Sequence, residues 1–227
     1  MAAPLPTVLL LHGLGRTARS MAPLAQQIRA AGFRTTNLDY PSTCHPIDTL
    51  VDEHVWPAVE AVRDDALLHV VTHSLGGILV RRLAERHGLP DGTRVVMIAP
   101  PNAGSPVADA LRDRWPFRWW CGPALRELGT HGEALPPRLG PLDGDRVEVG
   151  VIAGDRDIYP WFRSLRSGLS DGLVTVEGTK LEGMTDFTVV RAGHALIMRS
   201  PAVADEVVHF LRHGRFRNGN AGVRRTS

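Results

Sequence analysis

The sequence has few cysteines, no long apolar run and almost no net charge, and each of these absences excludes a class of protein. Cys44 and Cys121 are the only cysteines among 227 residues. Two cysteines make neither a disulfide framework nor a zinc site, so we expect free thiols in a reducing compartment, with a single bridge as the alternative. No apolar run approaches the roughly 18 residues that a membrane-spanning helix needs, so we expect no stable membrane insertion.

The charge balance gives no sign of a polyanionic partner. The formal net charge is +2, with 43% hydrophobic and 22% charged residues. Such a composition is ordinary for a globular protein and creates no strong field toward nucleic acid or a membrane surface. The first residues, MAAPLPTVLLLHG, lack the basic start of a secretory signal and end in a short apolar run. We interpret that run as a strand and expect a cytoplasmic location.

Short apolar runs alternate with amphipathic segments along most of the chain. The runs predict strands over residues 7–11, 33–38, 67–71, 94–99, 147–153 and 187–190. The amphipathic segments predict helices over residues 21–32, 47–63, 77–87 and about 201–212. Strands that alternate with helices predict an α/β fold: a mostly parallel central sheet with helices on both faces.

Two segments depart from this alternation. Residues 101–146 are too long for an ordinary connection and predict a small cap or lid of short helices inserted into a single domain of residues 1–216. Their aromatic residues are expected to pack the insertion's own core rather than to form a lid. These aromatic residues are Trp115, Phe117, Trp119 and Trp120. Residues 217–227 carry arginines and no acid, and predict a disordered tail.

The loop after the first strand, HGLGRTA, fits two kinds of site. Gly13, Gly15 and Ala18 match the G-x-G-x-x-A pattern of dinucleotide-binding loops, and Asp39 at the end of the second strand could bind a ribose. Alternatively, a His-Gly turn can direct the next backbone N–H toward a reacting carbonyl oxygen. The second interpretation also uses residues later in the chain that the first leaves unexplained, and we favour it.

Ser74 lies between a predicted strand and a predicted helix in the stretch VVTHSLGG. A sharp strand-to-helix turn lifts a serine hydroxyl clear of the sheet and presents it to a base, as in the G-x-S-x-G motif. Here Thr72 replaces the first glycine, but the position after a strand and before a helix is the expected one. A serine that only caps the helix is the alternative; the context favours a nucleophile.

A base and an acid should follow the serine in the chain. Among the ten histidines, only His194 lies in a loop directly after the last predicted strand. Four aspartates lie between the strand at 147–153 and this histidine. They are Asp155, Asp157, Asp171 and Asp186. Asp171, in SDGLV, is favoured as the acid that orients the imidazole, with Asp157 and Asp155 as alternatives.

When the serine attacks a carbonyl group, the carbonyl oxygen becomes negatively charged, and two backbone N–H groups are expected to bind this oxyanion. The N–H of Leu75 follows the nucleophile, and the N–H of Leu14, or less favourably of Gly15, lies in the first loop. Because these donors belong to the backbone, their side chains carry little information about the site.

Five motifs together resemble those of α/β-hydrolases of the bacterial lipase and esterase type, and more closely a lipase-like group related to inositol-deacylase-type hydrolases. They are LLLHGLGRT, VTHSLGGILVR, PPNAGSPVAD, SDGLVTVEGTKLEGMTDF and GHALIMRSPAVADEVVHFLRHGRF, and they span most of residues 7–216. The resemblance implies that Asp171, in D-G-x-V, is the acid and that Leu14, after His-Gly, is an oxyanion donor. It also implies that the group tolerates Thr72 in place of the first glycine.

The implied activity is hydrolysis of a small-molecule or lipid ester through an acyl-enzyme, without metal or cofactor. The resemblance names neither the natural ester nor an oligomeric state. An acyltransferase or thioesterase would use the same three residues and is the first alternative. A non-catalytic binding module is the second, and it is disfavoured because nucleophile, acid and base follow one another in the expected order.

Overall fold

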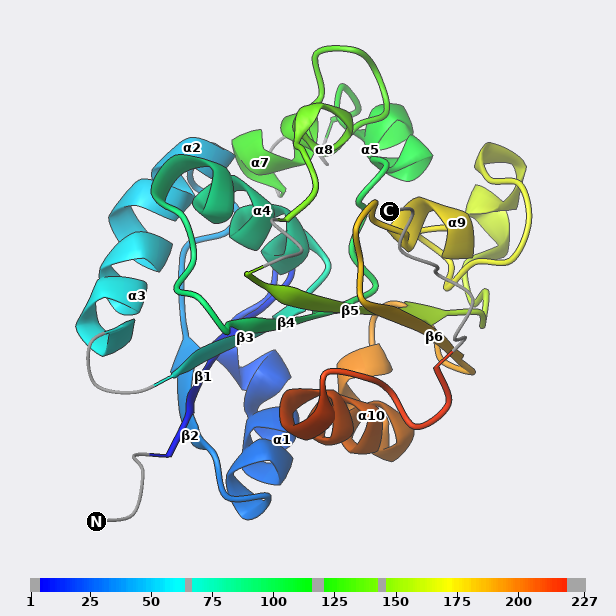
Figure 1. Cartoon of the computed structure of the whole chain (residues 1–227). Coiled ribbons are helices and arrows are strands. Elements are labelled where there is room, and N and C mark those ends of the chain that lie inside the picture. Colours follow the sequence, from blue (N-terminus) through cyan, green and yellow to red (C-terminus); the bar gives the residue numbers. More distant parts are fainter. Residues whose placement is uncertain (1–4, 64–66, 116–120, 143–145, 220–227) are drawn as a thin grey trace.

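The computed structural model describes residues 5–63, 67–115, 121–142 and 146–219, and one parallel sheet runs through the molecule (Figure 1). Its strands are β1 (Thr7–Leu11), β2 (Arg34–Leu38), β3 (Leu68–His73), β4 (Arg94–Ile98), β5 (Glu148–Gly154) and β6 (Asp186–Val190). They lie in the order β2-β1-β3-β4-β5-β6, and every neighbouring pair is parallel. The predicted α/β architecture is confirmed.

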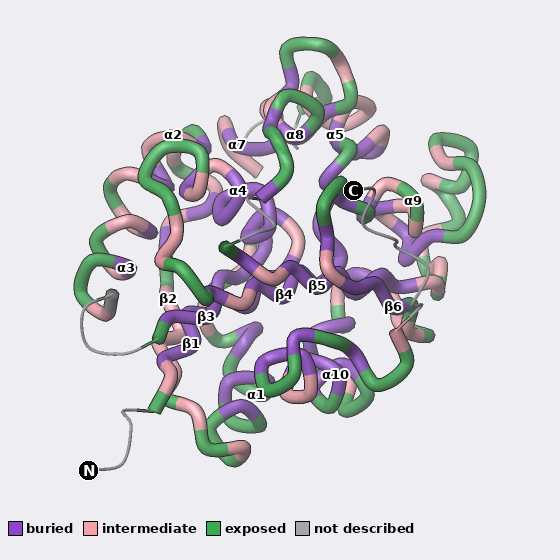
Figure 2. The backbone as a smooth tube through the Cα atoms, viewed as in Figure 1, coloured by how far each residue is buried: buried purple, intermediate pink, exposed green. Residues whose placement is uncertain are grey.

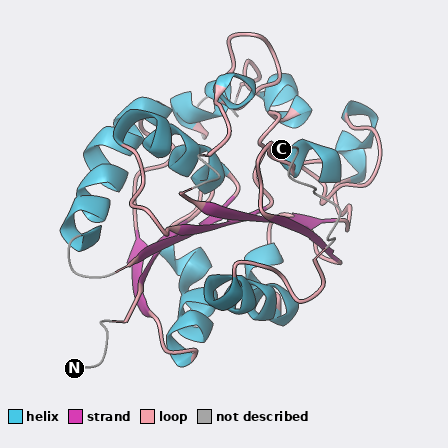
Figure 3. Cartoon of the chain, viewed as in Figure 1, coloured by secondary structure: helices cyan, strands magenta, loops and turns pink. Residues whose placement is uncertain are grey.

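Helices cover both faces of this sheet, as the three layers in Figure 3 show. One face is covered by α1 (Ala18–Ala30), α10 (Pro201–His213) and the short η3 (Ile197–Arg199). The other face is covered by α2 (Ile47–Leu50), η1 (Val51–Val55), α3 (Trp56–Arg63) and α4 (Leu75–His87). Short helices complete the connections: α5 (Pro106–Leu111), α7 (Gly122–Glu127), α8 (Leu135–Arg138), η2 (Pro160–Leu165) and α9 (Val176–Thr179).

The four central strands, β1, β3, β4 and β5, are buried because they feed two hydrophobic cores at once, whereas the edge strand β2 has no buried residue (Figure 2). Successive side chains of a strand point to opposite faces of the sheet. In β1, Val8 and Leu10 accordingly join the core under α1 and α10, while Leu9 and Leu11 join the core under α4. Burying each such side chain contributes about 1.5–3 kcal/mol, so this double coverage holds the sheet rigid beneath its loops.

The ends of the predicted elements differ from the observed ones by up to three residues: the helix predicted over 21–32 is α1, Ala18–Ala30. The differences near Ser74 matter most for the site. The strand predicted to end at 71 runs to His73, and the helix predicted to begin at 77 begins at Leu75. A single residue therefore joins strand to helix. The predicted helix over 47–63 is continuous, but five of its residues, Val51–Val55, form a π-helical turn.

The segment between β4 and β5 holds the short helices α5, α7 and α8. Arg81 of α4 is 4% exposed and ties this segment down by donating to the carbonyl oxygens of Asn102 and Leu139. Trp115 is 82% exposed, so the prediction that it packs into a core of the insertion is wrong. The other three aromatic residues of that prediction, at 117, 119 and 120, lie outside the described residues.

The chain after α10 folds back against the end of the sheet. Asp186 at the start of β6 accepts the N–H of Phe216 at 2.7 Å. Glu206 of α10 is 4% exposed and accepts the N–H groups of Arg217 at 2.7 Å and Asn218 at 3.3 Å. The first residues of the predicted tail are thus bound to the domain, and residues 220–227 lie outside the described part.

The described residues contain no helix with both the length and the apolar character needed to cross a bilayer. Cys44 and Cys121 are both free thiols.

Candidate active site

Ser74 occupies the one-residue turn between β3 and α4, at the carboxyl end of the sheet. Its backbone has φ 53° and ψ −118°, in the positive-φ region that residues other than glycine rarely adopt. Strain of this kind persists only where surrounding structure imposes it, and it concentrates at functional sites. Here the buried strand on one side and the buried first turn of α4 on the other impose it, and the turn exposes the hydroxyl.

Two glycines behind Ser74 allow α4 to lie this close to the sheet. A Cβ on Gly76 would stand 2.7 Å from the carbonyl oxygen of Leu11, and one on Gly77 would stand 2.8 Å from Cβ of Pro100. Both distances are shorter than real contacts of a Cβ atom, and the first is to rigid backbone. The glycines following the serine are therefore required by close packing.

Ser74, His194 and Asp171 form a hydrogen-bonded chain although they come from three separate connections. Nε2 of His194 lies 2.9 Å from Oγ of Ser74, and Nδ1 lies 2.7 Å from Oδ2 of Asp171. The backbone N–H of His194 also donates to the carbonyl oxygen of Asp171 at 3.0 Å. With its proton on Nδ1, the imidazole donates to the carboxylate and offers the Nε2 lone pair to the serine hydroxyl.

The carboxylate of Asp171 is completely buried and firmly oriented. Its Oδ1 accepts the backbone N–H groups of Leu173 at 2.9 Å and Val174 at 2.8 Å. Its other oxygen, Oδ2, faces His194. Two backbone donors stabilise the negative charge of a carboxylate that water cannot reach and fix the oxygen that meets the imidazole.

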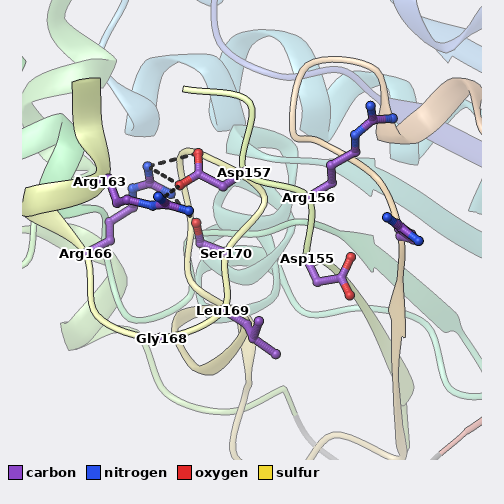
Figure 4. Close-up of a pocket in the computed structure, with 9 residues that line it drawn as sticks. Asp155, Arg156, Asp157, Arg163, Arg166, Gly168, Leu169 and Ser170 are labelled. Carbon is purple, nitrogen blue, oxygen red and sulfur yellow. Dashed lines mark hydrogen bonds and ion pairs between the residues drawn. The ribbon is translucent and has the colours of Figure 1, made fainter. Parts of the chain in front are cut away.

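The alternative acids, Asp155 and Asp157, line a separate cavity of about 510 Å³ (Figure 4). Asp157 pairs with Arg166 at 3.2 Å, and neither carboxylate bonds to His194. Although burial acts to raise the pKa of Asp157, hydrogen bonds from the Tyr159 N–H and from Arg166 lower it below its usual value. The structure thus brings Asp171, and not these residues, to the imidazole.

The first loop is held against Ser74 by groups that no sequence motif singled out. The hydroxyl of Tyr40 donates to the carbonyl oxygen of His12, and the two rings stack at 4.0 Å. The N–H of Gly15 donates to Oγ of Ser42 at 3.1 Å. A Cβ on Gly13 would stand 3.2 Å from Cβ of Ser74, so this loop passes directly over the serine.

Two backbone N–H groups beside Ser74 are available to a ligand. In the described part of the chain, the N–H of Leu14 donates to no protein acceptor, whereas that of Gly15 is bound to Ser42. Leu75 is the first residue of α4, where backbone N–H groups have no acceptor within the helix. The arrangement therefore favours Leu14 over Gly15 as the partner of Leu75.

The dinucleotide interpretation of the first loop loses support from Asp39. Its Oδ1 accepts the N–H of Ala18 at 2.8 Å, so the carboxylate binds the first residue of α1. A pyrophosphate would need the N-terminal amides of that helix, and an anion already occupies one of them.

His73 supports the neighbouring histidine from within the core. It is 2% exposed, and its Nε2–H donates to the carbonyl oxygen of His194 at 3.1 Å. Burial, reinforced by the nearby His194 ring, holds the pKa of His73 well below its ordinary value, so this ring is neutral. His73 therefore anchors the loop of His194 without adding charge beside it.

A largely apolar cavity of about 310 Å³ opens from Ser74. Side chains of α5, α7 and the connection between β5 and β6 supply its walls. Together with Leu14 of the first loop, the larger apolar ones are Val107, Leu111, Leu125, Leu128, Tyr159, Phe162, Leu173 and Val174. The aromatic part of the wall is Tyr159, directly before η2, and Phe162 within it. Neither residue was predicted from the sequence, because this irregular segment has no periodic pattern. Arg16 also lines the cavity, and its position within HGLGRTA was the available signal.

No group of three or more His, Cys, Asp or Glu side chains that could hold a metal ion occurs among the described residues.

The comparisons with known proteins agree with this architecture. The model of a family described as "Alpha/beta hydrolase family" matches residues 8–208. No curated protein matches the sequence.

Solved structures similar to this chain include three bacterial or metagenomic proteins. The mature lipase BlEst2 of Bacillus licheniformis has a TM-score of 0.67 at 18% identity, over 86% of this chain and 86% of its own. The metagenomic carboxyl esterase MGS0156 has a TM-score of 0.65 at 20% identity, over 86% of this chain and 65% of its own. The phospholipase PlaB of Legionella pneumophila has a TM-score of 0.61 at 19% identity, over 77% of this chain and 45% of its own. At these identities the likeness shows the fold alone.

Proposed function

The chain belongs to the alpha/beta hydrolase family, and from this premise we propose that it is a serine hydrolase that cleaves carboxylic esters through an acyl-enzyme on Ser74. The observation that carries the proposal is the hydrogen-bonded chain from Ser74 through His194 to Asp171. Beside it lie two backbone N–H groups and an apolar cavity, which are the further parts that acyl transfer needs.

The first step is attack by Oγ of Ser74 on the ester carbonyl. His194 accepts the hydroxyl proton at Nε2, across the 2.9 Å contact, and becomes an imidazolium. Asp171, with its buried carboxylate 2.7 Å from Nδ1, stabilises that cation and keeps Nε2 directed at the serine. The N–H groups of Leu14 and Leu75 bind the negative oxygen of the tetrahedral intermediate.

The second half of the cycle uses the same groups in reverse. His194 gives its proton to the leaving alcohol oxygen as the bond between carbonyl carbon and that oxygen breaks, which leaves the acyl group on Ser74. Water then attacks the acyl-enzyme while His194 accepts its proton, and collapse of the second intermediate returns that proton to Oγ of Ser74. The products are a carboxylic acid and an alcohol, and the cycle is balanced without a cofactor.

The cavity indicates the kind of acyl group. Its walls are mostly aliphatic and aromatic, and about 310 Å³ is at the lower end of the range for small-molecule sites. We therefore propose short or medium aliphatic acyl chains as substrates. PlaB, one of the similar structures, is described as a phospholipase, and this supports a lipid ester as one source of such chains.

The test measures hydrolysis of p-nitrophenyl butanoate and octanoate by the wild-type protein and by Ser74→Ala. We expect the substitution to abolish turnover and to abolish labelling by a fluorophosphonate, which reacts only with an activated serine. Asp205→Ala, which alters an exposed aspartate of α10 that does not line the cavity, is the control and should keep the wild-type rate.

Two results would contradict the proposal. A wild-type protein that is inert to the fluorophosphonate and to every ester would favour the binding-module alternative. Faster transfer of the acyl group to an added alcohol than to water would favour the acyltransferase alternative.

A further inference from the structure

Arg16 brings a cation into the otherwise apolar cavity beside Ser74. Among the described residues that line this cavity, Arg16 is the only arginine, and no lysine, aspartate or glutamate is present. The other titratable lining groups are His73, His194, Cys121 and Tyr159. Nothing of opposite charge within the described lining explains a guanidinium in this place.

The guanidinium has donors left over. Nη2 of Arg16 donates to the carbonyl oxygen of Ala195 at 3.2 Å, and within the described part of the chain its side chain makes no other hydrogen bond and no ion pair. Asp39, the acidic residue beside the start of α1, accepts a hydrogen bond from the N–H of Ala18 and does not pair with Arg16. An arginine has five N–H donors in a planar fork, so most of them remain free to bind an oxyanion.

The anchor of Arg16 shows which part of an ester it would meet. Ala195 directly follows His194, so the guanidinium lies on the side of the cavity that holds the imidazole. In ester cleavage Nε2 of His194 must reach the leaving alcohol oxygen in order to protonate it. The alcohol part of the ester therefore lies near Arg16, while the apolar walls are left for the acyl chain.

We propose that the enzyme prefers esters whose alcohol part carries an oxyanion, a carboxylate or a phosphate, and that Arg16 is the residue that binds it. This inference rests on the proposed function and adds the substrate class to it. The substrate combines an apolar acyl chain with a negatively charged alcohol. The recognition is a charge-assisted hydrogen bond, bidentate where the oxyanion presents two oxygens.

Two matched pairs of esters with one hexanoyl chain test the preference and distinguish the two anions. The carboxylate pair is 3-hexanoyloxypropanoate and its neutral propanamide; the phosphate pair is 1-hexanoylglycerol 3-phosphate and 1-hexanoylglycerol. Each pair differs in charge at the alcohol end and keeps the ester bond unchanged. The rate of hydrolysis is measured by titration of the released hexanoic acid. The quantity compared is the ratio of kcat/KM between the charged and the neutral member of each pair.

The variants are Arg16→Ala, Arg16→Lys and the matched control Arg19→Ala. Arg19 is an exposed arginine three residues further along that does not line the cavity, so its removal changes the net charge equally. We expect Arg16→Ala to lower the charged-to-neutral ratio of kcat/KM about tenfold for at least one pair. This is the lower end of the range for loss of a charge-assisted hydrogen bond, because Arg16 is half-buried and water still weakens the interaction. Arg16→Lys should restore part of the ratio, and Arg19→Ala should leave it unchanged.

Three outcomes would overturn the inference while leaving the proposed function intact. The first is a wild-type protein that hydrolyses the neutral members as fast as the charged ones. The second is an equal loss on both members in Arg16→Ala, since that indicates only an anchor for Ala195. The third is the same change of ratio in Arg16→Ala and Arg19→Ala, which indicates a long-range field. Inertness to all four esters and to a fluorophosphonate would instead be a failure of the proposed function.

Discussion

Replacement of Asp171 by asparagine should inactivate the proposed enzyme, because the structure fixes the direction of the new amide. Oδ1 of Asp171 accepts the N–H groups of Leu173 and Val174 at 2.9 and 2.8 Å, so the amide oxygen must remain there. The NH₂ group then faces Nδ1 of His194, where Oδ2 now lies at 2.7 Å. Nδ1 is forced to accept, its proton moves to Nε2, and Nε2 can no longer take the proton of Ser74.

The size of the effect follows from losing the reactive tautomer while the fold is kept. Such a change in a serine–histidine–aspartate site lowers kcat about 10⁴-fold, or about 5 kcal/mol in activation free energy. Asparagine keeps the size of the side chain and the bonds from Leu173 and Val174, so KM should change little. The assay is steady-state hydrolysis of p-nitrophenyl butanoate, with circular dichroism to verify that the variant is folded.

Asp157→Asn is the matched control, because it alters an aspartate in the same connection that bonds to Arg166 and not to His194. It should leave kcat within about threefold of wild type. It should also lower the free energy of unfolding by about 1–3 kcal/mol, since the side chain of Arg166 is 2% exposed and loses a charged partner. A larger loss of kcat in Asp157→Asn than in Asp171→Asn would refute the assignment of the acid.

Three further predictions concern packing, protonation and the first loop. Gly76→Ala should lower the free energy of unfolding by about 1–3 kcal/mol in urea titrations, because the new Cβ would stand 2.7 Å from the carbonyl oxygen of Leu11. The control Gly132→Ala, where no heavy atom lies within 4 Å of the new Cβ, should leave the free energy of unfolding unchanged. Burial lowers the pKa of His69 from 6.5 to about 4, so only the unfolded chain binds this proton between those values, and stability should fall as the pH drops from 6.5 toward 4. His69→Asn should flatten that slope, and an unchanged slope would contradict the assignment. Tyr40→Phe should lower kcat about tenfold on a neutral ester, since the loop of the proposed oxyanion donor loses an anchor, and a wild-type kcat would show that the bond is dispensable.

The fold could be predicted from the sequence because its elements are long, periodic and doubly covered. The apolar runs that became the central strands β1, β3, β4 and β5 are buried on both faces, which produces the uninterrupted hydrophobic pattern on which their prediction rested. The edge strand β2, with the sequence RTTNL, has neither this burial nor this pattern. The boundaries around Ser74 were less accurate, because a positive-φ residue can end a strand and begin a helix without any glycine or proline to signal it.

The candidate site could be predicted in part. Ser74 and His194 each follow a recognisable strand, so it was foreseeable that both would lie at the carboxyl end of the parallel sheet. Asp171 was favoured as the acid, but Asp157 and Asp155 stayed open as alternatives, because all three lie in one long connection and only its path in space decides which carboxylate meets the imidazole. Tyr159 and Phe162 were missed for the same reason, since irregular segments leave no periodic trace in the sequence.

The return of the chain after α10 also sets where this protein can be cut or joined to another. Asp186 and Glu206, 8% and 4% exposed, bind the backbone of residues 216–218, and the Thr188 hydroxyl of the edge strand β6 donates to the carbonyl oxygen of Asn218. Ending the chain before 216 would leave the buried carboxylate of Glu206 without donors and that of Asp186 with the N–H of Phe187 alone. It would also uncover a sheet edge that could pair with another copy. An affinity tag or fusion partner should therefore follow Gly219. A shorter chain that lacks residues 216–218 should be less soluble.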